Sequence, residues 1–345
     1  MVLKSLFALT GSEIAAELGL SKPYQGRQIY SWLCRGVTSF DRMTDIPLAL
    51  RERLSMSGIS VCSSTVLDKQ IDSDGACKLA LSLYDRNIVE CVLLTDREGN
   101  LTACLSSQVG CAMGCAFCRT GTLRLTRNLE AFEIVEQFIH LQATASALGV
   151  ISHVVFMGMG EPLANLGNVL KSIEFLHDPK GIGLSHRRIT VSTCGLVPGI
   201  ERLGKAGVPV RLAVSLVAAT DKKRSALMPV NRTFGLAGLR RSLENFPGSR
   251  RLTFEYCMIP DQNMSQQDAV SLAGFCKGLE VIVNLIPYNP CEELPFSAPS
   301  RSQIRTFTGY LDSLEVPYTI RVSRGRGIKG ACGQLAAKFQ NLSET

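Results

Sequence analysis

The sequence predicts an α/β protein built around a partial barrel. From about residue 100, short apolar segments alternate with amphipathic segments, an order typical of parallel strands joined by helices. Within residues 130–143, for example, apolar side chains recur at helical spacing. Six strands are predicted, over residues 101–106, 153–157, 188–192, 210–216, 252–259 and 281–286. Six β–α units on one parallel sheet form an open or partial (β/α)6 barrel, with functional groups at the carboxyl ends of its strands.

The residues before the barrel predict a small helical domain followed by a hairpin. Residues 11–34 predict two short helices, and Pro47 lies in the first turn of a third, with Asp45 as its cap. Alternating segments at 65–69, 78–84 and 88–94 predict short strands.

We therefore divide the chain into three parts. Residues 1–85 form an N-terminal helical accessory domain with a hairpin linker, and residues 86–300 form the barrel core. Residues 301–345 form a C-terminal extension, with a predicted strand at 318–322 before a segment rich in glycine and arginine.

The composition indicates a globular protein of a reducing compartment. The chain has 345 residues, 46% of them hydrophobic and 19% charged, which argues against disorder. We find no signal-peptide pattern and no apolar run of the ~20 residues that a membrane helix needs, so we expect a cytoplasmic protein without membrane association. In that setting the thirteen cysteines remain thiols, and close spacing among them indicates metal binding or catalysis. The net charge of +7 is compatible with a polyanionic partner.

Three closely spaced cysteines, Cys111, Cys115 and Cys118, follow the first predicted barrel strand. Three thiolates can bind three irons of a cubane cluster and leave one iron open to a small molecule. The alternative is a structural zinc site completed by Cys104 or by a distant cysteine or histidine. Zinc motifs usually contain two separated close pairs, and the sequence has no second pair. The spacing therefore favours an iron–sulfur cluster.

The cysteine spacing resembles the signature of radical S-adenosylmethionine enzymes. The surrounding segments resemble the adenosine-C2 RNA methyltransferases of the RlmN/Cfr family, and the resemblance covers nearly the whole chain. It is carried by residues 43–47, 106–111, 120–121, 127–129, 157–163, 187–193, 228–231, 283–289 and 331–335. It implies a radical-SAM barrel, a [4Fe-4S] cluster, two molecules of S-adenosylmethionine per turnover, and an electron donor such as a flavodoxin or ferredoxin.

The resemblance also implies the substrate and the chemistry. The substrates are C2 of one adenosine in 23S rRNA and C2 of the adenosine beside the anticodon in tRNAs. Cys332 takes a methyl group from one S-adenosylmethionine, and a radical made from a second one removes hydrogen from that S-methyl group. The methyl carbon then bonds to the adenine ring. Cys104 releases the product through a transient disulfide with Cys332, and Glu90 handles the proton lost from the ring.

Contacts to S-adenosylmethionine follow from the same resemblance. Gly160 and Glu161 match the segment that holds the methionine amino group, where a carboxylate suits an ammonium and glycine permits close approach. The remaining matched positions are Ser192, Ser215, Leu216, Val217 and Asn289. A serine at a strand end is also a common capping residue, so these positions rest on the resemblance rather than on their own pattern.

Basic residues indicate where RNA phosphates and a reactive thiol are expected. Residues 321–329 contain four cations close before Cys332, which should favour its thiolate form. The same segment and the runs at 222–224, 240–241 and 250–251 are candidate phosphate contacts. Runs of this kind are also common on solvated faces.

The chain departs from the family pattern in three places. Val217 replaces a histidine, so only a backbone contact to S-adenosylmethionine remains there. Residues 326–330 are basic where the family is acidic, and Arg119 replaces a small residue. These departures leave room for a divergent paralogue, and a radical enzyme that modifies a peptide or small molecule is one alternative. A C8-specific rRNA adenosine methyltransferase is another, because the shared cysteines serve both outcomes. A zinc-stabilised RNA-binding protein without enzymatic activity is the third alternative.

Overall fold

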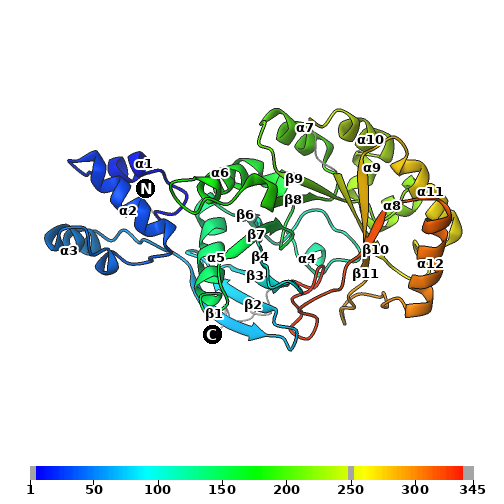
Figure 1. Cartoon of the computed structure of the whole chain (residues 1–345), viewed down its shortest axis with the longest axis horizontal. Coiled ribbons are helices and arrows are strands. Elements are labelled where there is room, and N and C mark those ends of the chain that lie inside the picture. The colour runs from blue at the N-terminus through cyan, green and yellow to red at the C-terminus, as the bar shows by residue number, and fades with distance from the viewer. Residues whose placement is uncertain (1–4, 248–251, 337–345) are drawn as a thin grey trace.

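A single curved sheet organises the computed structural model, which describes residues 5–247 and 252–336 (Figure 1). In this part of the chain the sheet has ten strands in the order β1-β2-β3-β4-β7-β8-β9-β10-β11-β12. From β4 to β12 every neighbouring pair is parallel. The sequence therefore predicted the fold class correctly.

The parallel strands lie where the sequence predicted them, each within two residues at either end. They are β4 (Leu101–Cys104), β7 (Ile151–Phe156), β8 (Ile189–Thr193), β9 (Arg211–Ser215), β10 (Leu252–Met258), β11 (Val281–Pro287) and β12 (Tyr318–Ile320). Apolar side chains of this half of the sheet belong to one continuous hydrophobic core. Strands of a parallel sheet that is covered by helices must be apolar, and these apolar segments therefore allowed the strands to be predicted from the sequence.

Helices cover the outer face of the parallel half (Figure 1). They are α5 (Ala131–Thr144), α6 (Leu166–His177), α7 (Val197–Lys205), α10 (Leu236–Glu244), α11 (Gln266–Cys276) and α12 (Arg301–Ser313). The α5 helix begins with a capping box between Glu130 and Glu133, and its Ile134 and Phe138 are buried. Within the described chain, no helix combines the length and apolar character needed to cross a membrane.

Short elements shape the loops on the inner side of the barrel. The helices are α4 (Arg119–Thr122), α8 (Asp221–Leu227) and α9 (Val230–Thr233), and the strands β5 (Gln108–Val109) and β6 (Arg127–Asn128) pair with each other. Single 3-10 turns lie at Phe40–Arg42, Pro162–Asn165 and His186–Arg188.

Antiparallel strands extend the same sheet at its other edge. They are β1 (Thr65–Ile71), β2 (Cys77–Ser82) and β3 (Ile88–Thr95), and β3 pairs with β4. Residue 85, where we divide the sequence into domains, lies in the turn between β2 and β3. The hairpin thus continues the barrel sheet.

The N-terminal helices α1 (Gly11–Glu17), α2 (Pro23–Cys34) and α3 (Leu48–Met56) lie at one end of the molecule (Figure 1). The rings of Phe7 and Tyr30 pack edge-on against Phe175 of α6, which attaches this part to the barrel. The predicted capping role of Asp45 is wrong. Pro47 occupies the cap position, and the Asp45 carboxylate instead accepts a hydrogen bond from the indole of Trp32.

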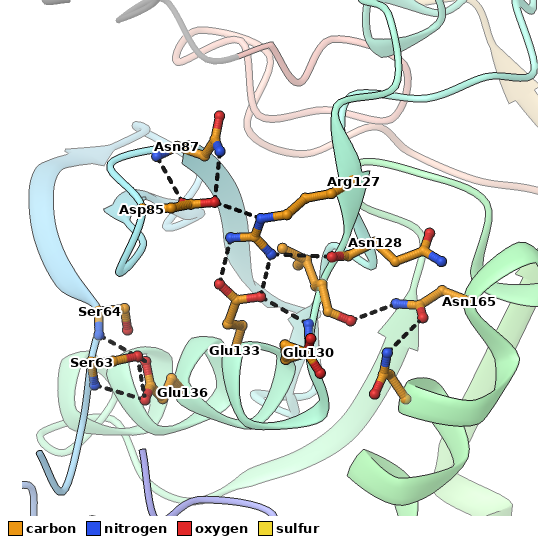
Figure 2. A network of polar contacts seen from close by, with 12 residues as sticks. Ser63, Ser64, Asp85, Asn87, Arg127, Asn128, Glu130, Glu133, Glu136 and Asn165 are labelled. Atoms are coloured by element: carbon orange, nitrogen blue, oxygen red, sulfur yellow. Dashed lines mark hydrogen bonds and ion pairs between the residues drawn. The ribbon is translucent and has the colours of Figure 1, made fainter. Parts of the chain in front are cut away.

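A polar network fastens both the hairpin and the segment after the cysteines to α5 (Figure 2). Arg127 donates two hydrogen bonds to Glu133, at 2.7 and 2.8 Å, and one to Asp85 at 2.6 Å. One turn further along α5, Glu136 accepts backbone hydrogen bonds from Ser63 and Ser64, both at 2.8 Å. Bidentate pairing with arginine makes this link directional as well as strong. The network therefore fixes the loop between β4 and α5.

Candidate active site

A cavity of about 390 Å³ opens at the carboxyl ends of the parallel strands. This location matches the expectation for parallel α/β sheets, where functional groups lie beyond the strand ends. Its lining includes most of the residues that the sequence singled out: Cys104, Cys111, Cys115, Cys118, Gly160, Glu161, Ser192, Ser215, Val217, Asn289 and Cys332. Leu216 and Glu90 are the two predicted residues outside the lining.

The three clustered cysteines lie in the loop between β5 and α4, and each is partly buried. The loop is held by backbone hydrogen bonds from Ala116 to Leu227 and from Arg119 to Gly333, at 2.9 and 2.7 Å. Among the described residues, no three histidine, cysteine or acidic side chains are arranged around a single ion. A cubane cluster does not require that convergence, since each thiolate binds a different iron. The donor set therefore fits an iron–sulfur cluster better than zinc.

Gly160 lies in the loop after β7 and has a φ of 101°, a conformation that favours glycine. A Cβ at this position would lie 2.5 Å from the Cβ of Gln108, so any side chain would displace its neighbour. Glu161 is buried, and its carboxylate accepts backbone hydrogen bonds from Leu163 and Cys194 at 3.1 and 2.8 Å. Burial raises the pKa of Glu161, although these hydrogen bonds oppose the shift. The backbone conformation and the close packing of Gln108 therefore both require glycine at position 160.

The end of β9 carries Ser215, Leu216 and Val217. Val217 is buried and has a φ of 59°, which is rare for a β-branched residue and strained. Its carbonyl accepts a hydrogen bond from Asn263 at 2.7 Å. The carbonyl of Leu216 is likewise engaged, by Arg224 at 3.1 Å. The local backbone is thus held in an unusual conformation where it borders the cavity.

The prediction that residues 222–224 contact phosphate is wrong for Arg224, which is buried. Its side chain is 0% exposed. The guanidinium donates to the carbonyls of Cys194, Ser215 and Leu216, at 2.6, 3.3 and 3.1 Å, and to the side chain of Asn231 at 2.9 Å. It therefore ties the ends of β8 and β9 together from below the cavity.

The other basic runs are mostly engaged within the protein. Lys223 pairs with Asp268 at 2.7 Å, and Arg240 pairs with Glu244 at 2.7 Å. In residues 321–329, Arg321 lies 3.7 Å from Glu255 and Lys329 lies 3.3 Å from Glu292. The run at 250–251 lies outside the described residues.

Cys332 and Cys104 are free thiols that line the same cavity, one in the C-terminal segment and one at the end of β4. Cys332 opens onto the cavity, and protein surrounds it elsewhere. Burial, together with nearby Cys118 and Glu255, raises the pKa of Cys332 to about 11 despite the charge of Arg321. Arg321 of the basic segment therefore acts in the predicted direction, toward the thiolate, and burial acts against it. Burial raises the pKa of Cys104 to about 12, and the proximity of Cys332 adds to the shift.

Hydrogen bonds from three parts of the chain hold the segment that carries Cys332, drawn in red in Figure 1. The carbonyl of Cys332 accepts a hydrogen bond from Asn289 at 3.1 Å. Thr120, beside the cluster cysteines, donates to the carbonyl of Leu335 at 2.6 Å. The amide of Gly325 donates to Asp74, in the turn between β1 and β2, at 2.8 Å.

Glu90 provides a further attachment. It lies on β3, is buried, and pairs with Lys78 at 3.0 Å. Its second oxygen accepts a hydrogen bond from the amide of Ala336 at 2.8 Å. Burial raises the pKa of Glu90, and Lys78 opposes the shift. In this arrangement Glu90 holds the C-terminal segment and does not face the cavity.

Sequence reasoning missed two buried residues of this site, Arg224 and Glu255. Glu255 lies in β10, is buried and lines the cavity. A charged residue inside an otherwise apolar strand was a usable signal, because an ion is seldom buried without a partner or a function. Arg224 carried no such signal, since it lies in a run of exposed-type residues.

Two family models match the chain. The Radical SAM superfamily model matches residues 105–273, and the model of the ribosomal RNA large subunit methyltransferase N-terminal domain matches residues 13–59. The first covers the cavity and the clustered cysteines, and the second covers the N-terminal helices.

Individual relatives match over nearly the full length. A probable dual-specificity RNA methyltransferase RlmN of Moorella thermoacetica is 44% identical, over 96% of each chain. The dual-specificity RNA methyltransferase RlmN of Anaeromyxobacter dehalogenans is also 44% identical, over 95% of this chain and 89% of the relative. A solved structure of a radical SAM methyltransferase from Sphaerobacter thermophilus superposes with a TM-score of 0.91 at 39% identity, covering 97% of this chain and 99% of that one.

Proposed function

The chain belongs to the RlmN family of radical S-adenosylmethionine RNA methyltransferases, and we propose that it methylates C2 of adenosine in RNA. Its substrates are one adenosine of 23S rRNA and the adenosine beside the anticodon in tRNAs. The dual specificity in the relatives' names supports two RNA substrates, and we infer a cytoplasmic location because such RNAs are found there.

One observation carries the proposal: Cys332 and Cys104 share a single cavity with the three clustered cysteines, and of the four further free thiols that line it only Cys332 is exposed, Cys194 and Cys257 being the other two. C2 of adenine is not nucleophilic, so simple methyl transfer cannot reach it. The chemistry needs a radical source, a methyl carrier and a means of releasing the product. A cavity with a cluster site and two separate thiols has all three parts.

Cys111, Cys115 and Cys118 would hold a [4Fe-4S] cluster. When bound, this cluster supplies the electron that cleaves S-adenosylmethionine reductively. We propose that the electron comes from a flavodoxin or ferredoxin and that each turnover uses two molecules of S-adenosylmethionine.

The cavity residues position S-adenosylmethionine. The loop containing Gly160 and Glu161 offers backbone groups and a carboxylate to the methionine ammonium. Asn289 supports this assignment because its Oδ1 is buried without a hydrogen-bond partner in the described chain. Ser192 and Ser215, at neighbouring strand ends, supply hydroxyl groups to the same cavity. At Val217 contact with the ligand is limited to backbone and apolar atoms, whereas Leu216 lies outside the cavity lining and would support the loop.

The two thiols act in sequence. Cys332 accepts a methyl group, this group loses one hydrogen atom to the radical, and its carbon then joins Cys332 to the adenine ring. Cys104 attacks the sulfur of Cys332, which forms a disulfide and frees the methylated RNA. Glu90 is the family's candidate for removing the ring proton. Its contacts with Lys78 and Ala336 imply that this role requires release of the C-terminal segment.

A trapping experiment tests the function. Replacing Cys104 by alanine should leave the enzyme joined covalently to RNA through Cys332, because the resolving thiol is absent. Mass spectrometry of nuclease-treated protein would identify the adduct, and Cys291→Ala serves as the matched control. A loaded enzyme with bound S-adenosylmethionine but no RNA adduct would instead favour a peptide or small-molecule substrate.

The position of methylation is tested in cells. RNA from a deletion strain should lack C2-methyladenosine in both 23S rRNA and tRNA. Unchanged C2-methyladenosine together with loss of C8-methyladenosine would assign the chain to the C8-specific alternative.

A further inference from the structure

Among the described residues, three carboxylates line the cavity: Asp96, Glu161 and Glu255. Asp96 and Glu161 have both carboxylate oxygens engaged in hydrogen bonds. Glu255 differs from them. Its Oε1 accepts a hydrogen bond from Asn284 at 2.9 Å, whereas its Oε2 is buried and has no partner in this part of the chain. A buried acceptor left unpaired costs about 1–3 kcal/mol, so its retention calls for an explanation.

The strand register directs Glu255 into the barrel. Glu255 of β10 is aligned with Ser215 of β9 and with Asn284 of β11. The Asn284 side chain is itself fixed by a hydrogen bond from Thr319 of β12, at 2.6 Å. These four polar residues form a row across neighbouring parallel strands, which holds the Glu255 carboxylate in one orientation. The nearest cation, Arg321, stands 3.7 Å from Oε2 and leaves this oxygen without a hydrogen bond.

Cys332 and Glu255 line the same cavity, and the charge of Glu255 contributes to the raised pKa of the Cys332 thiol. The other titratable groups facing Cys332 are Cys104, Cys118, Cys257 and Arg321. Together with Cys332 and Glu255 these make six groups. Four of the six are thiols, and the Arg321 guanidinium has no basic lone pair at neutral pH. A thiol must lose its proton to become a strong nucleophile. Glu255 is the group here that can receive it.

We propose that Glu255 accepts the thiol proton of Cys332 when that thiol is methylated, a role that rests on the proposed function. The Cys332 sulfur forms a bond to the methyl carbon of S-adenosylmethionine, and the bond from that carbon to the sulfonium breaks. S-adenosylhomocysteine leaves, and the proton moves to Oε2 of Glu255. No oxidant or reductant takes part in this step.

The charge of Glu255 and its basicity predict opposite effects of Glu255→Gln. If Glu255 acted only through its negative charge, its removal would favour the Cys332 thiolate and accelerate methyl transfer. If it receives the proton, its removal slows methyl transfer, since general bases contribute roughly 10²–10⁴-fold. The sign of the change therefore separates the two roles.

The test compares wild-type holoenzyme with Glu255→Gln at neutral pH. Peptide mass spectrometry follows the gain of a methyl group on Cys332 after addition of S-adenosylmethionine. We expect a decrease of roughly 10²-fold in the variant. In parallel, the rate at which iodoacetamide alkylates Cys332 should be unchanged or higher. This rate depends only on the accessibility of the thiol and on the fraction present as thiolate. Glu292→Gln is the matched control, since Glu292 is exposed, pairs with Lys329 and lies outside the cavity lining.

Each outcome decides the matter. Slower methylation with undiminished alkylation, and control rates equal to wild type, supports the proposal. Methylation that is unchanged or faster in Glu255→Gln overturns it, and so does a parallel slowing of methylation and alkylation, which indicates a structural role. Wild-type holoenzyme whose Cys332 never gains a methyl group overturns the proposed function and this role with it.

Discussion

The side-chain amide of Asn289 donates a hydrogen bond to the backbone carbonyl of Cys332, over 3.1 Å. Asn289 follows β11, whereas Cys332 belongs to the C-terminal segment. Asn289 also lines the cavity, and its side-chain oxygen is buried without a partner within the described chain. One residue thus links the proposed binding site for S-adenosylmethionine to the proposed methyl carrier.

Replacing Asn289 by alanine should weaken both functions of this side chain. We expect about fivefold weaker binding of S-adenosylmethionine for each hydrogen bond lost, since one is worth about 1 kcal/mol. The C-terminal segment should also be cleaved faster by trypsin, because Arg324 and Lys329 lie in it. Equilibrium binding and timed proteolysis measure the two effects. Asn245→Ala, at an exposed position on the outer helices, should change neither.

Arg224→Met should destabilise the barrel. The substitution removes the Arg224 donor from the carbonyls of Cys194 and Ser215, at a site closed to water, whereas the carbonyl of Leu216 keeps a hydrogen bond from the amide of Ala218 at 2.7 Å. Unmet buried carbonyls cost about 1–3 kcal/mol each, so we expect the free energy of unfolding to fall by about 3 kcal/mol. Urea denaturation measures it. The exposed neighbour Lys222→Met is the control, and equal stability of the two variants would contradict the assigned role.

The contribution of Asp85 to stability should depend on pH. Burial alone would raise the pKa of Asp85, but hydrogen bonds from Arg127 and Asn87 hold it at about 2 (Figure 2). A pKa below that of the unfolded chain means that the stabilisation is present above about pH 4 and is lost as the pH falls towards 2. Because Asp85 is exposed, we expect it to be worth only about 1 kcal/mol.

The measurement compares thermal unfolding of wild type and Asp85→Asn from pH 7 downwards. The difference in melting temperature should be largest near neutrality and shrink below about pH 4. A difference that stays constant across this range would contradict the assignment.

Metal content distinguishes the two interpretations of the clustered cysteines. Anaerobic reconstitution should load iron and sulfide and produce a brown protein, whereas Cys115→Ala should bind markedly less iron. The variant should still fold, because the barrel core does not depend on this loop. Elemental analysis and absorbance measure the outcome. A colourless protein loaded with zinc would contradict the cluster interpretation.

The local pattern of residues was sufficient for the barrel. Alternating apolar segments located each parallel strand within two residues, because a strand buried on both faces must be apolar along its length. The same pattern misjudged the edges of the molecule. Asp45, whose residue type and position suit a cap, instead binds the indole of Trp32, because packing of the N-terminal helices brings the two side chains together.

The chemical parts of the candidate site were also visible in the sequence, since Cys111, Cys115 and Cys118 are close in the chain and Cys332 and Cys104 lie in recognisable segments. Their environment was not visible. Burial outweighs the basic segment in setting the pKa of Cys332, and burial depends on segments far apart in the chain. The sequence shows which cations lie near a thiol along the chain, but it does not show how exposed that thiol is to solvent.

What the sequence alone determined is the set of reactive groups and the order of strands that carries them. Only the tertiary structure decided which buried polar groups have a hydrogen-bond partner and which do not. Arg224 became a buried clamp on strand ends, and Glu255 kept one carboxylate oxygen without a hydrogen bond in the cavity that Cys332 also lines, because parallel register and chain crossover determine their neighbours. Hydrogen bonds act over about 3 Å, so those choices exist only once the chain is folded.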